Sequence, residues 1–232
     1  MVTQPQVVAS LDVVYPDSDG KPMADNTKQF RWIVVIEQNL EWLFEGNPEV
    51  FVAGDLLWYP VEGNNTLRIA PDALVVFGRP KGERGSYQQW CEDRIPPQVV
   101  FEILSPGNTP REMDRKLLFY NTYGVEEYYL YDPDRNRLEG WARSQEGLLD
   151  RIESIIGWVS PRLGVRFELE QELQLYRPDG TPFYSFAEIN QMLVQERQRA
   201  EQERQRAEQS EQRAAEMEGL LQQYRDRFGA LD

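Results

Sequence analysis

The sequence has no histidine and only one cysteine, Cys91, among its 232 residues. Without histidine, the protein cannot use a Ser-His-Asp triad, a zinc-hydrolase motif or a histidine–metal nuclease site. A single cysteine excludes a disulfide within the chain and a thiolate-cluster metal site, and it is typical of a reducing compartment. Any catalytic chemistry must therefore use Asp, Glu, Lys, Arg, Ser or Tyr.

Long apolar segments are also missing from the sequence. No apolar run approaches the roughly 18 residues that a membrane-spanning helix needs. The N-terminal segment has neither the basic region nor the apolar core of a signal peptide. We therefore expect a cytoplasmic protein with no membrane partner.

Positive charge is scarce: 25 Lys and Arg stand against 39 Asp and Glu, which gives a formal net charge of −14 at pH 7. Residues 195–232 contain seven arginines and nine acidic residues, so nearly all of the net negative charge belongs to the preceding part of the chain. An acidic body repels polyphosphate at long range and lacks the charge pattern of a protein that coats nucleic acid. Contact with DNA would have to be local, transient or assisted by a partner.

The composition predicts one folded domain with two appendages. Hydrophobic residues make up 41% of the chain and aromatic residues 12%, which is enough apolar surface for a full core. Residues 1–27 are rich in Pro, Asp and Ser and predict an irregular leader. We expect the domain over residues 28–184, and a long charged helix that can form a coiled coil over residues 185–232.

The domain is expected to have an α/β order of elements. Helical spacing over residues 28–44 places four apolar residues on one side: Phe30, Ile33, Leu40 and Phe44. Strand character recurs in five short segments: 50–59, 67–77, 98–104, 127–132 and 137–143. A second helix between the third and fourth segments is marked by its expected caps: Thr109, Pro110, Glu112 and Gly124. The order is thus helix, three strands, helix and strand pair, with residues 144–184 as further short strands and turns.

The C-terminal segment has a seven-residue repeat. One heptad position is occupied by apolar residues: Ala200, Ala207, Ala214, Leu221 and Phe228. The companion position is polar until Met217 and Tyr224, so a dry coiled coil is expected only near the C-terminal end. We expect a projecting solvated helix of about 60 Å that associates with its own copy or with a partner protein through residues 195–232. A lone charged helix with no binding role is the alternative.

The apolar run at residues 99–104, VVFEIL, contains a single carboxylate, Glu102. Burying an unpaired ionised carboxylate costs several kcal/mol, so such a residue is normally neutralised by a cation or a metal ion. Asp72 follows Pro71 at the start of another apolar run, DALVVF. If the two segments are neighbours in one sheet, their carboxylates can converge on one cation. Two carboxylates, a backbone carbonyl and waters form a hard-oxygen site suited to Mg²⁺ or Mn²⁺.

Lys116 is the cationic residue nearest to this arrangement. It shares one side of the second predicted helix with three residues that should pack on the sheet: Met113, Tyr120 and Tyr123. A buried ammonium needs an anion, and Glu102 is the nearest candidate along the chain. The tyrosines are expected to be core or interface aromatics rather than catalytic groups. Asp114 and Glu37 are candidate accessory residues, although Asp114 should point away from the sheet and Glu37 can lie at the solvent edge of the first helix.

Each of the three main candidates has a simpler structural interpretation. Asp72 can start a strand or cap a turn. Glu102 can be a structural ion-pair partner of Lys116 or Arg111, and Lys116 can extend to water with its stem packed. Their occurrence together and in this order favours a joint site.

Three motifs, PDALVV, VVFEILSP and REMDRKLLFYNTYGVEEYYLYDP, together resemble the Uma2 family of restriction-endonuclease-like proteins, within the PD-(D/E)XK nuclease superfamily. The resemblance covers roughly residues 28–170 and implies a restriction-endonuclease-like core. It also implies that Asp72 and Glu102 are metal ligands, with the carbonyl of Ile103 as a third. The lysine of the superfamily belongs two residues after the glutamate, where this chain has Leu104, and Lys116 is the matching residue.

Two functions follow from these observations. The first is a Mg²⁺-dependent endodeoxyribonuclease that hydrolyses DNA phosphodiester bonds, with the metal ion activating a water and Lys116 offsetting charge on the phosphate. DNA would then be a transient substrate. The second is a catalytically weak or inactive protein with a nuclease fold, which assembles through its C-terminal helix. The acidic body and the residue Leu104 motivate this alternative.

Overall fold

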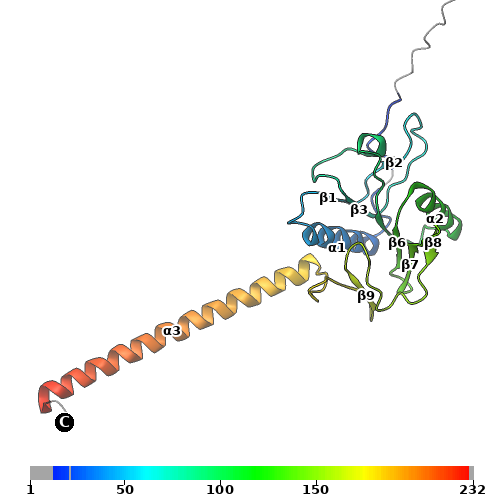
Figure 1. The fold of residues 1–232 in the computed structure, drawn as a ribbon. Coiled ribbons are helices and arrows are strands. Elements are labelled where there is room, and N and C mark those ends of the chain that lie inside the picture. Colours follow the sequence, from blue (N-terminus) through cyan, green and yellow to red (C-terminus); the bar gives the residue numbers. More distant parts are fainter. Residues whose placement is uncertain (1–12, 21, 230–232) are drawn as a thin grey trace, which may run out of the picture. The chain divides into compact units, whose positions relative to one another are not determined.

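The computed structural model describes residues 13–20 and 22–229 (Figure 1). The chain forms two compact units, and the boundary between them lies between Phe183 and Tyr184. The first unit contains the sheets and two helices, and the second contains one long helix. The division follows the change in sequence character, because the apolar alternation of the strands stops where the charged repeat begins.

The first unit is built on a six-stranded sheet. Its strands, in spatial order, are β1 (Val50–Ala53), β3 (Ala73–Phe77), β5 (Val99–Ile103), β6 (Glu127–Asp132), β7 (Arg137–Arg143) and β8 (Leu149–Arg151). β5 and β6 run parallel, and the other neighbours in this sheet are antiparallel. A parallel pair needs a crossover, and helix α2 (Pro110–Tyr123) provides it. The predicted α/β order is therefore confirmed.

Two smaller sheets complete the unit. β2 (Trp58–Tyr59) pairs with β4 (Tyr87–Gln88), which leads into a short 3-10 helix, η1 (Gln89–Cys91). β9 (Arg166–Leu169) and β10 (Leu173–Tyr176) form a hairpin. Trp58 and Tyr87 pack in the core on one face of the main sheet, and Phe167, Leu173 and Leu175 of the hairpin pack in the core on the other face.

Helix α1 (Thr27–Leu43) covers one face of the main sheet. Its N-cap, Asn26, accepts a hydrogen bond from the backbone N–H of Gln29. The apolar residues that it buries are Trp32, Ile33, Ile36 and Leu40. The expected position of Phe30 on this face is wrong, since its side chain is 49% exposed. Trp32 and Ile36 shift the centre of the buried stripe and leave Phe30 on the flank.

Helix α2 covers the opposite face. Tyr120 is fully buried there, in a core that includes Trp58, Val100 and Tyr128. The predicted caps are present: Thr109 accepts from the backbone N–H of Glu112, Pro110 is the first helical residue, and Gly124 ends the helix at φ +94°. The main sheet is therefore sandwiched between two helical layers, and side chains alternate between the two cores along each strand.

Two of the expected strands are shorter in the structure than in the sequence interpretation. Segment 50–59 is interrupted at Asp55, whose φ of +48° is left-handed, so β1 and β2 are separate strands. Segment 67–77 becomes a regular strand only at Ala73. Before Ala73, it forms one isolated β-bridge, between Ile69 and Trp58. The break at Asp55 matters for the site described below.

Helix α3 (Phe186–Phe228) makes up most of the second unit. It begins with the predicted capping box, in which Ser185 and Glu188 bond each other's backbone N–H groups. Its 43 residues give a length of about 65 Å. No described residue of α3 is buried. No helix in the described part of the chain is both long enough and apolar enough to cross a membrane.

Candidate active site

Asp72 and Glu102 meet at the ends of two paired strands. β3 and β5 are antiparallel with Ala73 opposite Phe101, so the next position of the same register sets Asp72 opposite Glu102. The predicted pairing of these two segments is therefore present. Both carboxylates lie on the face covered by α2, and they are 8% and 3% exposed. Two acidic side chains are thus held side by side in a largely dry environment.

Glu102 has two hydrogen-bonding partners on α2. The ammonium Nζ of Lys116 donates to Oε2 of Glu102 at 2.7 Å, and the hydroxyl of Tyr120 donates to Oε1. One helical turn separates the two donors, so the regular geometry of α2 presents both to the same carboxylate. The expected pairing of Lys116 with Glu102 is present. Tyr120 was expected to be a core aromatic only, and the structure adds a hydrogen bond to that role.

The charges of the site set its protonation states. Burial, reinforced by the charge of Glu102, raises the pKa of Asp72 well above its usual value, although the backbone N–H of Ile103 donates to Asp72 Oδ2 at 2.6 Å. Burial alone would lower the pKa of Lys116, but the neighbouring Glu102 outweighs this effect and raises it. Burial also raises the pKa of Tyr120 well above its usual value. Lys116 is therefore a cation at neutral pH, and Tyr120 is a neutral donor.

Asp55 is a site residue that the sequence interpretation missed. Its backbone N–H donates at 3.1 Å to the carbonyl of the residue before Asp72. The pKa of Asp55 is raised by burial, then by the nearby charge of Asp19, and the charges of Lys116 and Glu102 also act on it. A carboxylate that directly follows the apolar run VFVAG is a signal that could have been used. Treating residues 50–59 as one continuous strand hid it.

The oxygen atoms of Glu102 and Ile103 have acceptor directions that no protein donor uses. An ionised carboxylate has about four acceptor directions, and Glu102 uses one for Lys116 and one for Tyr120. The carbonyl of Ile103 accepts from the side-chain amide of Gln29 at 2.9 Å, which leaves its second lone pair. Oxygen ligands of this kind suit Mg²⁺ or Mn²⁺. The types of donor present therefore suit a divalent cation.

The carboxylates of Asp55, Asp72 and Glu102 do not surround a common point in the structure. Among the residues that the structure describes, no three Asp, Glu, His or Cys side chains form a group that could hold a metal ion. Asp55, Asp72 and Glu102 carry three negative charges when ionised against the one ammonium of Lys116. Burial is the main cause of the raised pKa of Asp72, and the negative charges of Glu102 and Asp55 add to it; a bound cation would offset these charges.

The two accessory candidates belong to the two helices, Glu37 to α1 and Asp114 to α2. Glu37 is half-buried on α1, and its carboxylate accepts from the side-chain amide of Gln38 at 2.6 Å. Its stem lies near the backbone of Asp72, since an added Cβ at Gly54 would be 3.3 Å from Glu37 Cγ and 3.4 Å from the carbonyl oxygen of Asp72. Asp114 is exposed and lines a shallow hollow that also includes Leu117. Neither carboxylate shares a hydrogen bond with Glu102 in the structure.

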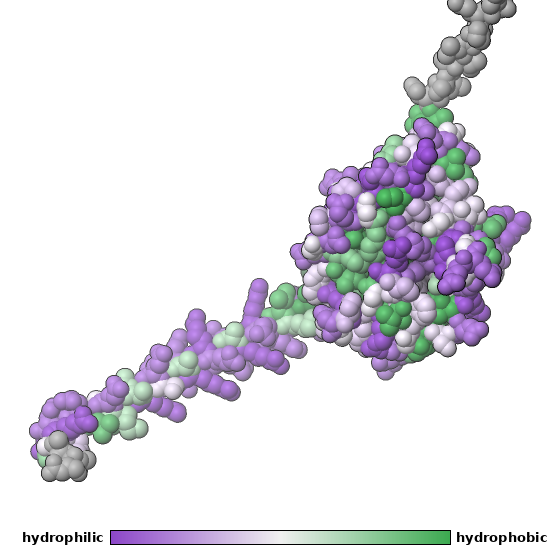
Figure 2. Space-filling model, in the orientation of Figure 1, coloured by the Kyte–Doolittle hydropathy of each residue, from purple (hydrophilic) through white to green (hydrophobic). Residues whose placement is uncertain are grey.

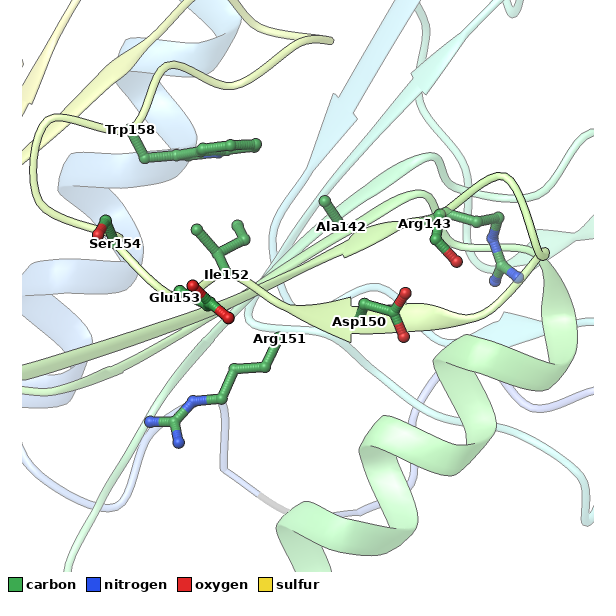
Figure 3. Close-up of a pocket in the computed structure, with 9 residues that line it drawn as sticks. Ala142, Arg143, Asp150, Arg151, Ile152, Glu153, Ser154 and Trp158 are labelled. Atoms are coloured by element: carbon green, nitrogen blue, oxygen red, sulfur yellow. The ribbon is translucent and has the colours of Figure 1, made fainter.

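The pocket shown in Figure 3 is a separate feature. It is an open hollow formed by β7, β8 and the segment that follows them, with Arg143, Asp150 and Trp158 among its lining residues. Neither Asp72 nor Glu102 lines it. The carboxylate site is thus a cluster of side chains under α2 and not part of this hollow.

With this geometry in place, comparison with known proteins identifies the family. The family model described as "Putative restriction endonuclease" matches residues 21–155, which is more than half of the chain. The chain belongs to the Uma2 family. The resemblance predicted from the three motifs is confirmed, and the Uma2 match contains all four of the described site residues: Asp55, Asp72, Glu102 and Lys116.

The other comparisons add less. No curated protein matches this Uma2 chain. Among solved structures, it is similar to one titled a "putative nuclease" from Anabaena variabilis, at 17% sequence identity and a TM-score of 0.45, over 61% of this chain and 74% of that one. A similarity at this level carries no argument about the site. The hairpin β9–β10 and helix α3 lie outside the Uma2 match.

Proposed function

We propose that this Uma2 protein is an endodeoxyribonuclease that requires Mg²⁺ or Mn²⁺. The observation that carries the proposal is the ion pair of Lys116 and Glu102, buried beside Asp72. An amine next to two adjacent carboxylates is the set of groups that metal-assisted phosphodiester hydrolysis needs. The family description supports the same class of reaction.

Each residue has a distinct part in the proposed reaction. Asp72, Glu102 and the carbonyl of Ile103 would hold the divalent cation, with Asp55 as a further oxygen ligand. When bound, the cation supplies Lewis acidity that makes a water nucleophilic at neutral pH. The ammonium of Lys116 offsets the negative charge that develops on the phosphate.

The position of the lysine supports this assignment. Leu104 takes the place two residues after Glu102 where the superfamily has its lysine. The amine of Lys116 reaches the same carboxylate from α2, at 2.7 Å. Tyr120 is a positioning residue, because its hydroxyl holds the other oxygen of Glu102.

DNA is the proposed substrate, and a cytoplasmic location goes with it. The net charge of −14 argues for a transient encounter in which the cation and Lys116 make the main favourable contacts with the phosphate. Binding should therefore be weak without divalent cations. Its dependence on monovalent salt should be shallow, since few phosphates are neutralised.

The proposal is tested by nicking of supercoiled plasmid DNA. We expect cleavage with MgCl₂ or MnCl₂, and none with EDTA. Glu102→Gln and Lys116→Met should each abolish cleavage, while Asp134→Asn, which alters an exposed ion pair with Lys28, should not. Circular dichroism of each variant shows whether the fold is kept. Full cleavage by a folded Glu102→Gln protein would exclude the proposed site.

The alternative is a protein with a nuclease fold, with weak or no turnover, that works through α3. It is favoured by Leu104 and by the exposure of α3 along its described length. This function would give no cleavage with either cation and no saturable cation binding, together with assembly through α3. The same plasmid assay, combined with a titration of Mn²⁺, distinguishes the two.

A further inference from the structure

The C-terminal part of α3 exposes an apolar stripe. Its large side chains are 52–64% exposed: Met217, Leu220, Leu221, Tyr224 and Phe228. Figure 2 shows hydrophobic residues in this part of the helix among hydrophilic neighbours. The rings of Tyr224 and Phe228 contact each other, with their centroids 4.7 Å apart. Water-exposed apolar side chains grouped on one helix face indicate an interaction surface.

The stripe follows a heptad. Taking Ala207 as position a gives further a positions at Ala214, Leu221 and Phe228. The d positions are then Ser210, Met217 and Tyr224. A seam of a and d positions is the packing surface of a coiled coil. Small residues in its first half allow two helices to approach closely, and large residues in its second half supply the apolar area.

The charges beside the seam select the partner. In the first two heptads, Arg206 and Arg213 lie at g and Glu211 and Glu218 lie at e; the last heptad has Leu220 and Arg227 at g and Arg225 at e. In a parallel pair, a g residue faces the e residue of the next heptad on the other helix, so Arg206 meets Glu211 and Arg213 meets Glu218, while Arg225 faces Leu220. In an antiparallel pair, g faces g and e faces e, which brings arginine to arginine and glutamate to glutamate. A second copy of the same helix, in parallel, is therefore the complementary partner.

The same rule marks where the pairing starts. One heptad earlier, the g and e residues are Arg199 and Arg204, which would repel each other in a parallel pair. The d position there is Glu203, which would lie in the seam facing its own copy. Both features oppose association before Arg206.

We infer that residues 207–228 form a parallel two-stranded coiled coil with a second copy of this chain. The paired segment is about 33 Å long. In a parallel dimer, both copies of the first unit are attached at the same end of the pair. This inference rests on α3 alone and does not depend on the nuclease proposal.

The first test is the mass of the full chain in solution by sedimentation equilibrium. We expect a dimer, with twice the chain mass of 27.2 kDa. Leu221→Glu places a charge in the seam and should halve the mass. Gln223→Glu adds the same charge on the outer face and should leave the dimer intact. A monomeric wild type, a trimer, or a dimeric Leu221→Glu protein would overturn the inference.

The second test is the direction of the pair. The exposed Cys91 is first removed by Cys91→Ser, so that a new cysteine is the only one. Oxidation should link two copies of Ala207→Cys, since a parallel pair in register brings identical a positions together. Gln209→Cys, on the outer face, is the matched control and should not link. A linked product formed between Ala207→Cys and Phe228→Cys, but not between two Ala207→Cys chains, would show an antiparallel pair and contradict the inference.

Discussion

Removing the ammonium of Lys116 should destabilise the first unit, because Glu102 would stay buried without its cation. The pair has an N–O distance of 2.7 Å, and the Glu102 side chain is only 3% exposed. Breaking a buried ion pair costs about 3–5 kcal/mol. Since the Lys116 side chain is 19% exposed and Tyr120 still donates to Glu102, we expect Lys116→Met to lose about 3 kcal/mol, at the lower end of that range.

Urea unfolding followed by tryptophan fluorescence measures this loss. All six tryptophans precede residue 184, so the signal reports on the first unit and not on α3. A loss of about 3 kcal/mol corresponds to a Tm lower by roughly 6–12 °C in a domain of this size. The raised pKa of Lys116 means that the stabilisation is complete below the usual lysine pKa of 10.5 and is lost only as the pH rises through the folded-state value.

Two further variants make the test decisive. Lys28→Met removes an exposed pair with Asp134, in which the side chains are 46% and 50% exposed, and should cost less than about 1 kcal/mol. The double variant Lys116→Met, Glu102→Gln leaves no buried charge without a partner, and it should recover most of the loss. The reasoning would be refuted if Lys116→Met were no less stable than Lys28→Met, or if the double variant were as unstable as the sum of the single ones.

Three more predictions concern stability. Because burial raises the pKa of Asp72 above its unfolded value, the stability of the wild type should fall as the pH rises through the folded-state pKa. Without divalent cations, Asp72→Asn should therefore be more stable than the wild type at neutral pH but not in acid. Urea unfolding of both proteins across a range of pH checks this. Tyr120→Phe should lose about 2 kcal/mol with its hydrogen bond to a carboxylate, and equal stability to wild type would argue against that bond. Gly164→Ala should lower the Tm, because φ is +67° and the new Cβ would lie 2.9 Å from a proline ring, whereas Gly46→Ala meets nothing within 4 Å and should change it little.

The sequence was sufficient for the features that local physics determines. A carboxylate in the middle of the run VVFEIL had to be neutralised, and Glu102 is indeed paired with Lys116. Thr109 and Gly124 marked the ends of α2 because caps depend on a few neighbouring residues. The spacing of Met113, Tyr120 and Tyr123 indicated which side of α2 faces the sheet, and Lys116 on that side reaches Glu102 of β5.

The features that the sequence did not reveal depend on tertiary structure. The strand break at Asp55 arises from a single left-handed residue, and the apolar pattern continues through it to Trp58. Nothing local shows that this break places Asp55 next to the residues before β3. Phe30 was misplaced for a similar reason, since the centre of the buried stripe on α1 is set by the whole face of the sheet.

Diffraction from crystals soaked in MnCl₂, measured at the manganese absorption edge, tests the central claim most directly. We predict one anomalous peak per chain, in contact with the carboxylates of Asp72 and Glu102 and close to the ammonium of Lys116. The same soak of Glu102→Gln crystals should show no peak there. A wild-type map without a peak between these residues, or a peak of equal height in the Glu102→Gln map, would contradict the account.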